Sequence, residues 1–198
     1  MRQRWLRNSL ISLSKAGWAQ NAVTRWGLAR RVASRYVAGD TLEKAIEAIR
    51  ALNGRGLMAT LDSLGENTTN SEEAAGAADE IILALEAIDA AGARSNVSIK
   101  LSQIGLTLSE SLCRENLARI LTRARELDNF IRIDMEDSSL TARTLAALNW
   151  AVHQGFDNVG IVIQAYLYHS VEDIQAILAM NGRVRLCKGA YDEPPGVA

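Results

Sequence analysis

Hydrophobic and polar positions alternate in five short segments of this chain, and each segment ends in polar residues. The segments are 56–66, 96–106, 130–137, 159–166 and 183–191. Between them lie four stretches with the length of helices, which end at or near glycines such as Gly92 and Gly155. Strands that alternate with helices in this way predict a parallel sheet covered by helices.

One parity of each predicted strand is apolar, and the other is polar or small. Parallel strands that are buried on both faces usually form continuous apolar runs. Here successive side chains, which point to opposite faces of a sheet, differ in character. We therefore expect the apolar parity to pack under the helices and the polar parity to face a bound ligand. In the second segment, Val97, Ile99 and Leu101 alternate with Ser98, Lys100 and Ser102.

Two arrangements could hold these units: an open doubly wound sheet, or most of a (β/α)8 barrel. The first segment is not followed by a glycine-rich phosphate loop, because the glycines of residues 54–56 precede the strand. Polar groups stand at the C-terminal end of every segment, as they do in barrels. We therefore predict an α/β fold, an incomplete TIM-type (β/α)8 barrel over residues 56–198, with an N-terminal helical arm over residues 1–55.

Composition adds constraints on function and location. The 198 residues are 48% hydrophobic and 23% charged, with a net charge of −1, which is typical of a soluble globular protein and does not indicate nucleic-acid binding. The two cysteines fit no metal spacing and favour a reduced, cytoplasmic setting. No apolar run reaches the roughly 18 residues that would span a bilayer.

The N-terminal arm has its own charge pattern. Its first acidic residue is Asp40, and basic residues interleaved with Trp5, Trp18 and Trp26 precede it. Such a segment is either an amphipathic, membrane-seeking or targeting segment or a helical arm packed on the barrel with a solvated basic face. We favour the second interpretation.

Lys100 stands within a predicted strand on the polar parity, where an unpaired charge is costly. It could form a Schiff base, hold a substrate or cofactor as a cation, or make a structural ion pair. Asp134 and Glu136 lie on the polar parity of the third segment and could bind a divalent metal. Asp134 could instead pair with Lys100 or Arg185. We favour a functional lysine and an ion-paired aspartate, and we expect no metal site, because no second ligand cluster accompanies the carboxylates.

The segment 185–191 carries the densest set of candidate binding residues. A guanidinium such as that of Arg185 suits an anion or an electron-rich ring. Gly189 has the same parity and would let a planar ligand approach the backbone, and Tyr191 continues that parity. Gln164 ends the fourth segment and can both donate and accept hydrogen bonds at a heterocycle edge. We expect these residues to meet at one end of the barrel.

Taken together, these segments resemble the proline dehydrogenase family in its monofunctional bacterial form. The resemblance rests on LDSLGE (61–66), SIKLSQIGL (98–106), RIDMEDSS (132–139), VGIVIQAYL (159–167) and RLCKGAY (185–191), in the family's order. It implies a distorted (β/α)8 barrel that holds FAD at the C-terminal ends of the strands. It also implies oxidation of L-proline to 1-pyrroline-5-carboxylate in proline catabolism, with electrons passed to a membrane quinone. A cytoplasmic protein with peripheral association at the inner face of the membrane would follow.

The resemblance implies catalytic roles for four residues. Lys100 would lie beside substrate and flavin, with Asp134 as its partner in a hydrogen-bonded pair. Asp134 would also border the cofactor. Tyr191 would pack against the proline ring, and Glu66 would pair with an arginine on the family's last helix.

The resemblance also implies a cofactor-binding set. Met135 would line the flavin site, and Gln164 would bond the isoalloxazine edge. Arg185 would donate a hydrogen bond near flavin N5. The backbone around Cys187 and Gly189 would hold the ring system.

This chain departs from the family pattern in two respects. Cys187 stands where family members more often have an apolar residue. The sequence has no counterpart of the family's sixth to eighth strands, its Thr-His-Asn flavin motif or its final helix with two carboxylate-binding arginines. We therefore expect a partial barrel, truncated after the fifth strand, with little activity by itself.

The residues alone leave two other functions open. A Schiff-base lyase of the aldolase type would use Lys100, and borohydride would trap a carbonyl substrate on it. A non-catalytic barrel fragment would instead bind a partner through its basic arm, and deletion of residues 1–36 would abolish that binding.

Overall fold

The computed structural model describes residues 39, 41–62, 65, 68–189 and 191–198. The chain divides into two compact units between Ala48 and Ile49. The predictions for the arm before residue 39, and the role of Glu66, lie outside the described residues. Among the residues that are described, no helix has the length and apolar character needed to cross a membrane.

Helices and strands alternate along the described chain, as the sequence predicts. In order they are α4 (Leu42–Gly54), β1 (Ala59–Asp62), α5 (Ser71–Ala90), β2 (Ser95–Ile99), α6 (Glu110–Glu126), β3 (Ile131–Ile133), α7 (Thr141–His153), β4 (Val159–Gln164), α8 (Ser170–Ala179) and β5 (Arg183–Cys187).

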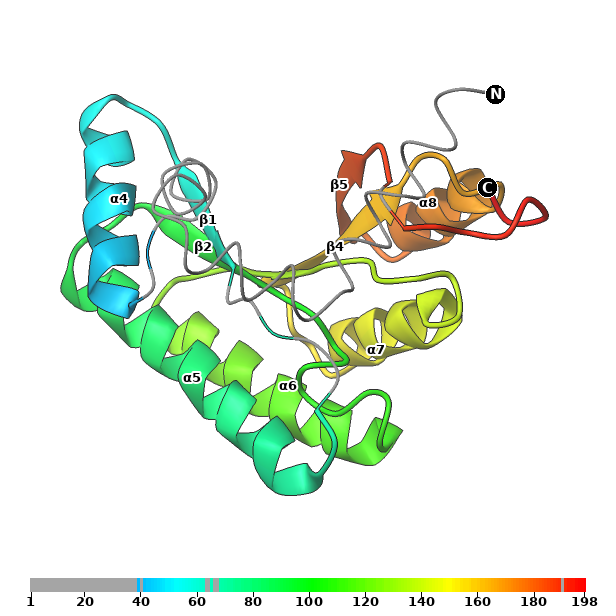
Figure 1. Ribbon diagram of the computed structural model, residues 1–198, viewed down its shortest axis with the longest axis horizontal. Coiled ribbons are helices and arrows are strands. Elements are labelled where there is room, and N and C mark those ends of the chain that lie inside the picture. The colour runs from blue at the N-terminus through cyan, green and yellow to red at the C-terminus, as the bar shows by residue number, and fades with distance from the viewer. Residues whose placement is uncertain (1–38, 40, 63–64, 66–67, 190) are drawn as a thin grey trace, which may run out of the picture. The chain divides into compact units, whose positions relative to one another are not determined.

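The strands form one five-stranded parallel sheet in the order β1-β2-β3-β4-β5. Each strand therefore adds to the same side of its predecessor. A doubly wound sheet reverses direction at a switch point, so this order agrees with a barrel wall and excludes that alternative for the described strands. Helices α5, α6 and α7 lie on one side of the strands (Figure 1).

The apolar parity of the inner strands packs beneath the helices, as predicted. The β2 and β3 side chains Val97, Ile99, Ile131 and Ile133 are buried, and Ile161 on β4 is buried beside them. Burying a side chain of this size stabilises the fold by about 1.5–3 kcal/mol. The prediction fails on β5, where Leu186 is 58% exposed, because β5 is an outer strand of the described sheet and only α8 packs against it closely.

The second strand is shorter than its apolar pattern predicts. It ends at Ile99, and residues 101–108 form a series of turns in which the backbone N–H groups of Ile104 and Leu106 both donate to the carbonyl oxygen of Leu101. Gly105 permits this path with a φ of 102°. Leu101, Ile104 and Leu106 are all buried, so the apolar pattern of this segment reflects a buried loop.

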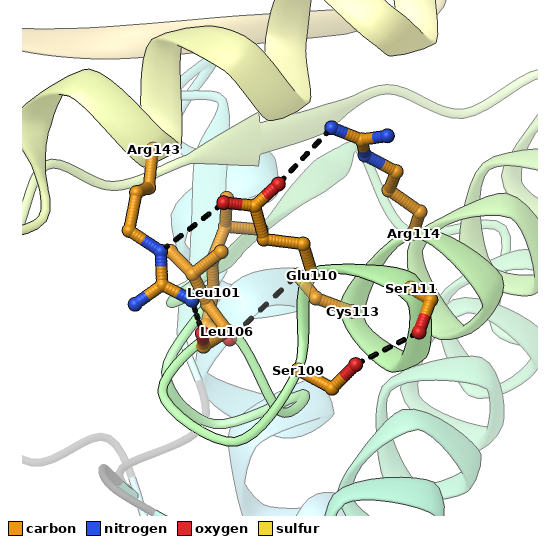
Figure 2. A network of polar contacts seen from close by, with 8 residues as sticks. All are labelled: Leu101, Leu106, Ser109, Glu110, Ser111, Cys113, Arg114 and Arg143. Atoms are coloured by element: carbon orange, nitrogen blue, oxygen red, sulfur yellow. Dashed lines mark hydrogen bonds and ion pairs between the residues drawn. The ribbon is translucent and has the colours of Figure 1, made fainter.

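A polar network fastens this loop to the helices that follow it (Figure 2). Arg143 on α7 donates to the carbonyl oxygen of Leu106, and its Nε lies 3.5 Å from Glu110 Oε1. Glu110 also pairs with Arg114, at 3.3 Å. The loop that begins immediately after Lys100 is thereby held at its C-terminal end.

Candidate functional site

The polar parity of the strands forms one continuous face of the sheet. Strand register places Asp62, Ser98, Arg132, Gly160 and Arg183 in one row. One step further along the same face lie Lys100, Asp134, Val162 and Arg185. Because parallel strands end on the same edge, polar residues that are far apart in sequence converge there.

A cavity of about 310 Å³ opens at this edge of the sheet. Its volume is within the range of small-molecule sites, about 300–1,000 Å³. Every described residue that the sequence assigned to the site lines it, together with Val162. The lining residues are Lys100, Asp134, Met135, Val162, Gln164, Arg185, Cys187, Gly189 and Tyr191. The structure therefore brings the candidates together, while their individual roles stay predictions.

Two ion pairs lie on this face, and neither joins Lys100 to Asp134 as the family resemblance implied. Asp134 Oδ1 lies 3.0 Å from Arg185 Nη2. Lys100 Nζ lies 3.6 Å from Asp62 Oδ2. Asp134 thus pairs with the arginine, which the residue pattern left open, and the Lys100–Asp134 pair implied by the resemblance is not formed.

Asp62 is a site residue that sequence reasoning missed. Burial raises the pKa of its carboxyl group. The neighbouring Lys100 acts in the opposite direction, and Asp134 adds to the rise. The sequence contained one signal that could have identified Asp62: it ends β1 on the same polar parity as the other candidates. It gives Lys100, which lines the cavity, a carboxylate partner.

Glu136 holds the strand-end loops together, which is a different role from metal binding. It is 4% exposed and accepts hydrogen bonds from both the backbone N–H, at 3.0 Å, and the hydroxyl of Ser102. Its own carbonyl oxygen accepts from Gln164 Nε2 at 2.9 Å. In the part of the chain that is described, no three His, Cys, Asp or Glu side chains gather closely enough to hold a metal ion.

Gln164 presents an unused acceptor in the cavity wall. Its amide nitrogen donates to the carbonyl oxygens of Met135 and Glu136. Its Oε1 is buried and has no hydrogen-bond partner among the described residues. A buried acceptor of this kind is costly unless something donates to it, so a ligand with an N–H at its edge would suit this position.

Gly189 packs closely against the ring of Tyr166. Gly189 has a φ of 108°, and a Cβ there would lie 2.1 Å from Cδ1 of the Tyr166 ring. Glycine at this position therefore leaves room for the Tyr166 ring, while the approach of a planar ligand to the backbone here stays a prediction. Its hydroxyl donates to the carbonyl oxygen of Tyr191 at 3.2 Å, which ties the end of β4 to the segment after β5.

The segment after β5 is also fastened across the sheet. Glu193 accepts hydrogen bonds from the backbone N–H of Ser138, at 2.8 Å, and from the hydroxyl of the same residue. Ser138 precedes α7, whereas Glu193 follows Tyr191 by two positions. This contact holds the Tyr191 segment near the ends of β3 and β4.

The residues present fit a flavin ring system. Met135 and Val162 are buried apolar side chains in the wall. Gln164 Oε1 offers an acceptor that lacks a donor, and Arg185 offers a cation. An apolar wall with a few placed polar groups is the usual composition of a cofactor site.

Sequence comparison identifies relatives of this chain. The profile of the family described as proline dehydrogenase matches residues 45–194. Proline dehydrogenase 1 of Bacillus subtilis is 43% identical over 166 residues, which cover 84% of this chain and 55% of the relative. Proline dehydrogenase of Deinococcus radiodurans is 39% identical over 177 residues, which cover 87% of this chain and 56% of the relative. The chain thus spans about half the length of these curated relatives.

Structural comparison supports the fold. The crystal structure of proline utilization A (PutA) from Bdellovibrio bacteriovorus, inactivated by N-propargylglycine, has a TM-score of 0.71 to this chain. The match covers 77% of this chain and 20% of that protein, at 22% sequence identity. At this identity the likeness concerns the fold alone, and it agrees with the incomplete barrel predicted from the sequence.

Proposed function

This chain belongs to the proline dehydrogenase family, and we propose that the protein oxidises L-proline to 1-pyrroline-5-carboxylate with FAD held in the cavity at the strand ends. The observation that carries this proposal is the cavity itself. Residues from β4 and β5 and from the segments that follow β2, β3 and β5 line this one space, and all but Val162 are predicted from the sequence.

The cavity residues would hold the cofactor as follows. Gln164 Oε1 would accept from an N–H at the ring edge, since it lacks another donor. Met135 and Val162 would contact the ring and exclude water. Arg185 would place positive charge where the reduced ring gains negative charge, and Asp134 would orient its guanidinium. When bound, FAD would supply the two-electron acceptor for the substrate's hydride.

Lys100 and Asp62 would shape the charge beside the substrate. Their 3.6 Å separation makes them an ion pair, of which Lys100 lines the cavity. Tyr191, held by Tyr166 and by the contact between Glu193 and Ser138, would lie against the substrate ring. In a Schiff-base lyase the Lys100 nitrogen would have to leave Asp62 and attack a carbonyl carbon, so this contact favours the oxidoreductase.

We also propose that electrons pass to a membrane quinone. The protein would then be cytoplasmic and would associate peripherally with the inner face of the membrane. This part of the proposal rests on the family resemblance.

We propose that the 198-residue polypeptide by itself binds FAD weakly and oxidises little proline. It spans about half the length of its curated relatives, and β1 and β5 are the outer strands of the described sheet. Outer strands carry unpaired backbone groups that favour association with other chains.

The test is flavin content and its response to proline. The purified protein should show flavin absorbance that bleaches anaerobically when proline is added, and the product should react with o-aminobenzaldehyde. The 198-residue polypeptide is compared with a version completed by the missing part of a relative. A completed, folded protein without flavin absorbance would overturn the proposal. Borohydride trapping of a carbonyl compound on Lys100 would favour the lyase instead.

A further inference from the structure

Cys187 is a free thiol in the wall of the cavity. It ends β5, lines the cavity with Arg185 and Gly189, and is partly exposed. Its register partner on β4 is Gln164, so both side chains lie on the same face of the sheet. The family resemblance implies a role for the backbone at this position, and the function proposed above gives the sulfur none.

Gln164 independently indicates that a ligand covers this spot. The residue is 3% exposed and lines the same cavity, yet its Oε1 has no hydrogen-bond partner among the described residues. A ligand that donates to this oxygen must lie beside the register partner of Gln164, which is Cys187. The thiol is therefore exposed to small molecules when the ligand is absent and covered when it is present.

The chain contains its own control for thiol reactivity. Cys113 on α6 is fully buried, with its Sγ 3.9 Å from the carbonyl oxygen of Leu101. Burial raises the pKa of this thiol to about 12. The thiolate is the reactive form of cysteine, and a buried neutral thiol is inert. Any rapid reaction at neutral or mildly alkaline pH should therefore occur at Cys187.

The charges around the cavity select the kind of reagent. Lys100 and Arg185 line it with Asp134 as the one acidic side chain among the described residues of the wall, which leaves the lining with a net positive charge; Asp62, the partner of Lys100, is not among the lining residues. Small disulfides that carry carboxylates would be attracted to these two cations. Cavities lined by charge of one sign raise the local concentration of ligands of the opposite sign.

We propose that Cys187 is a thiol–disulfide exchange site for small anionic disulfides, and that its modification and ligand binding in the cavity exclude each other. The Cys187 thiol loses its proton to solvent, and the thiolate attacks one sulfur of the disulfide. A bond forms between Cys187 Sγ and that sulfur, and the reagent's S–S bond breaks. The other half leaves as a thiolate. Excess thiol reverses the exchange by the same route. The identity of the excluded ligand as FAD rests on the proposed function.

The probe is 5,5′-dithiobis(2-nitrobenzoate), an aromatic disulfide with two carboxylates. The folded protein without flavin should release about one equivalent of the coloured thiolate per chain, because only one of its two thiols is accessible. Cys113→Ser should react like the unaltered protein, and Cys187→Ser should not react. Mass spectrometry of peptides from the unaltered protein locates the added group even where a variant folds poorly.

Saturating FAD should slow the reaction about tenfold or more, since bound ligands are largely enclosed by their pockets. The modified protein should bind FAD correspondingly more weakly, and dithiothreitol should restore binding. An unreactive Cys187, a label on Cys113, or unchanged FAD affinity after modification would overturn the inference while leaving the proposed function intact. Reaction at Cys187 in a folded protein that is completed by the missing part of a relative and still never binds FAD would support the exchange site and overturn the proposed function.

Discussion

Arg185 and Asp134 meet across strand β4, with 3.0 Å between Arg185 Nη2 and Asp134 Oδ1. Val162 lies between them in register and is small enough to leave the path open. The aspartate is 16% exposed at its side chain and the arginine 45%. The contact therefore orients a half-exposed cation over the cavity. Its contribution to the stability of the fold is small, because exposed ion pairs contribute little.

Arg185→Met should slow flavin reduction by proline more than it destabilises the protein. Loss of a cation where negative charge develops costs about 2–4 kcal/mol in activation free energy. Loss of a half-exposed ion pair costs about 1 kcal/mol or less in stability. Anaerobic stopped-flow kinetics and urea unfolding measure the two effects. Arg183→Met is the matched control. Arg183 lies on the same strand as Arg185, but its guanidinium stacks over the ring of Phe130, 5.1 Å from the ring centroid, and is not among the residues that line the cavity. Unchanged turnover in Arg185→Met would remove this residue from the site.

Asp62→Asn should remove one contribution that lowers the stability of the protein as pH rises. Burial raises the pKa of Asp62 in the folded state above its ordinary value of 3.8. The folded state therefore binds this proton more tightly than the unfolded chain, and the free energy of unfolding falls as pH rises from below 3.8 through the raised pKa. Urea unfolding across acidic and neutral pH measures this slope.

The matched control for Asp62→Asn is Asp79→Asn, which removes a carboxylate from an ion pair with Arg119 on the helices. If Asp62→Asn keeps the slope of the unaltered protein, burial of this carboxylate does not shape the acid profile.

Gly189→Ala should destabilise the protein more than Gly155→Ala. Both glycines have positive φ, 108° and 80°, and an alanine with positive φ costs on the order of 1 kcal/mol. A Cβ at Gly155 meets no atom within 4 Å, whereas at Gly189 it meets the Tyr166 ring. Displacing a packed ring adds about 1–3 kcal/mol. Chemical denaturation of the two variants measures the difference, and equal values would show that the Tyr166 ring moves aside at little cost.

Glu136→Ala should cost about 2–3 kcal/mol of stability, because it leaves the buried backbone N–H of Ser102 without its charged acceptor. Glu136→Gln retains an acceptor and should cost less. Glu126→Ala is the control, since its carboxylate is 56% exposed in a pair with Arg123 and should contribute about 1 kcal/mol or less. Thermal and urea unfolding rank the three variants. If the first and third are equally stable, Glu136 does not fasten the strand ends.

Much of the fold and the membership of the site could be predicted from one-dimensional pattern. Alternation of side chains assigns each strand residue to a face, so Ile131 and Ile133 could be placed in the core and Asp134 on the open face. Parallel strands end on a common edge, so residues as distant as Lys100 and Arg185 could be expected to line one cavity. The hydrophobic pattern predicts the face of the sheet on which a residue lies, because that face depends only on the two-residue period of a strand.

Pattern was less informative where packing, and not strand alternation, set the spacing of apolar residues. The sequence pattern placed Leu101, Ile104 and Leu106 in a continued strand. In the structure these residues are buried, but they belong to a series of turns that follows the end of the strand at Ile99. Leu186 has the parity of a core residue and is exposed, since coverage of a strand depends on its neighbours in the sheet. Neither the end of β2 at Ile99 nor the exposure of Leu186 can be predicted from the alternation of apolar and polar residues along one strand.

The sequence by itself determined the order of strands and helices, the face on which each strand residue lies, and the residues around the cavity other than Val162. Only the tertiary structure decided the partners within that set: Asp134 with Arg185, Lys100 with Asp62, and the Tyr166 ring in the space beside Gly189. The physical reason is that partner choice depends on the stagger between strands and on the reach of each side chain. Differences of an ångström or two there select one carboxylate over another, and no periodicity along the chain records them.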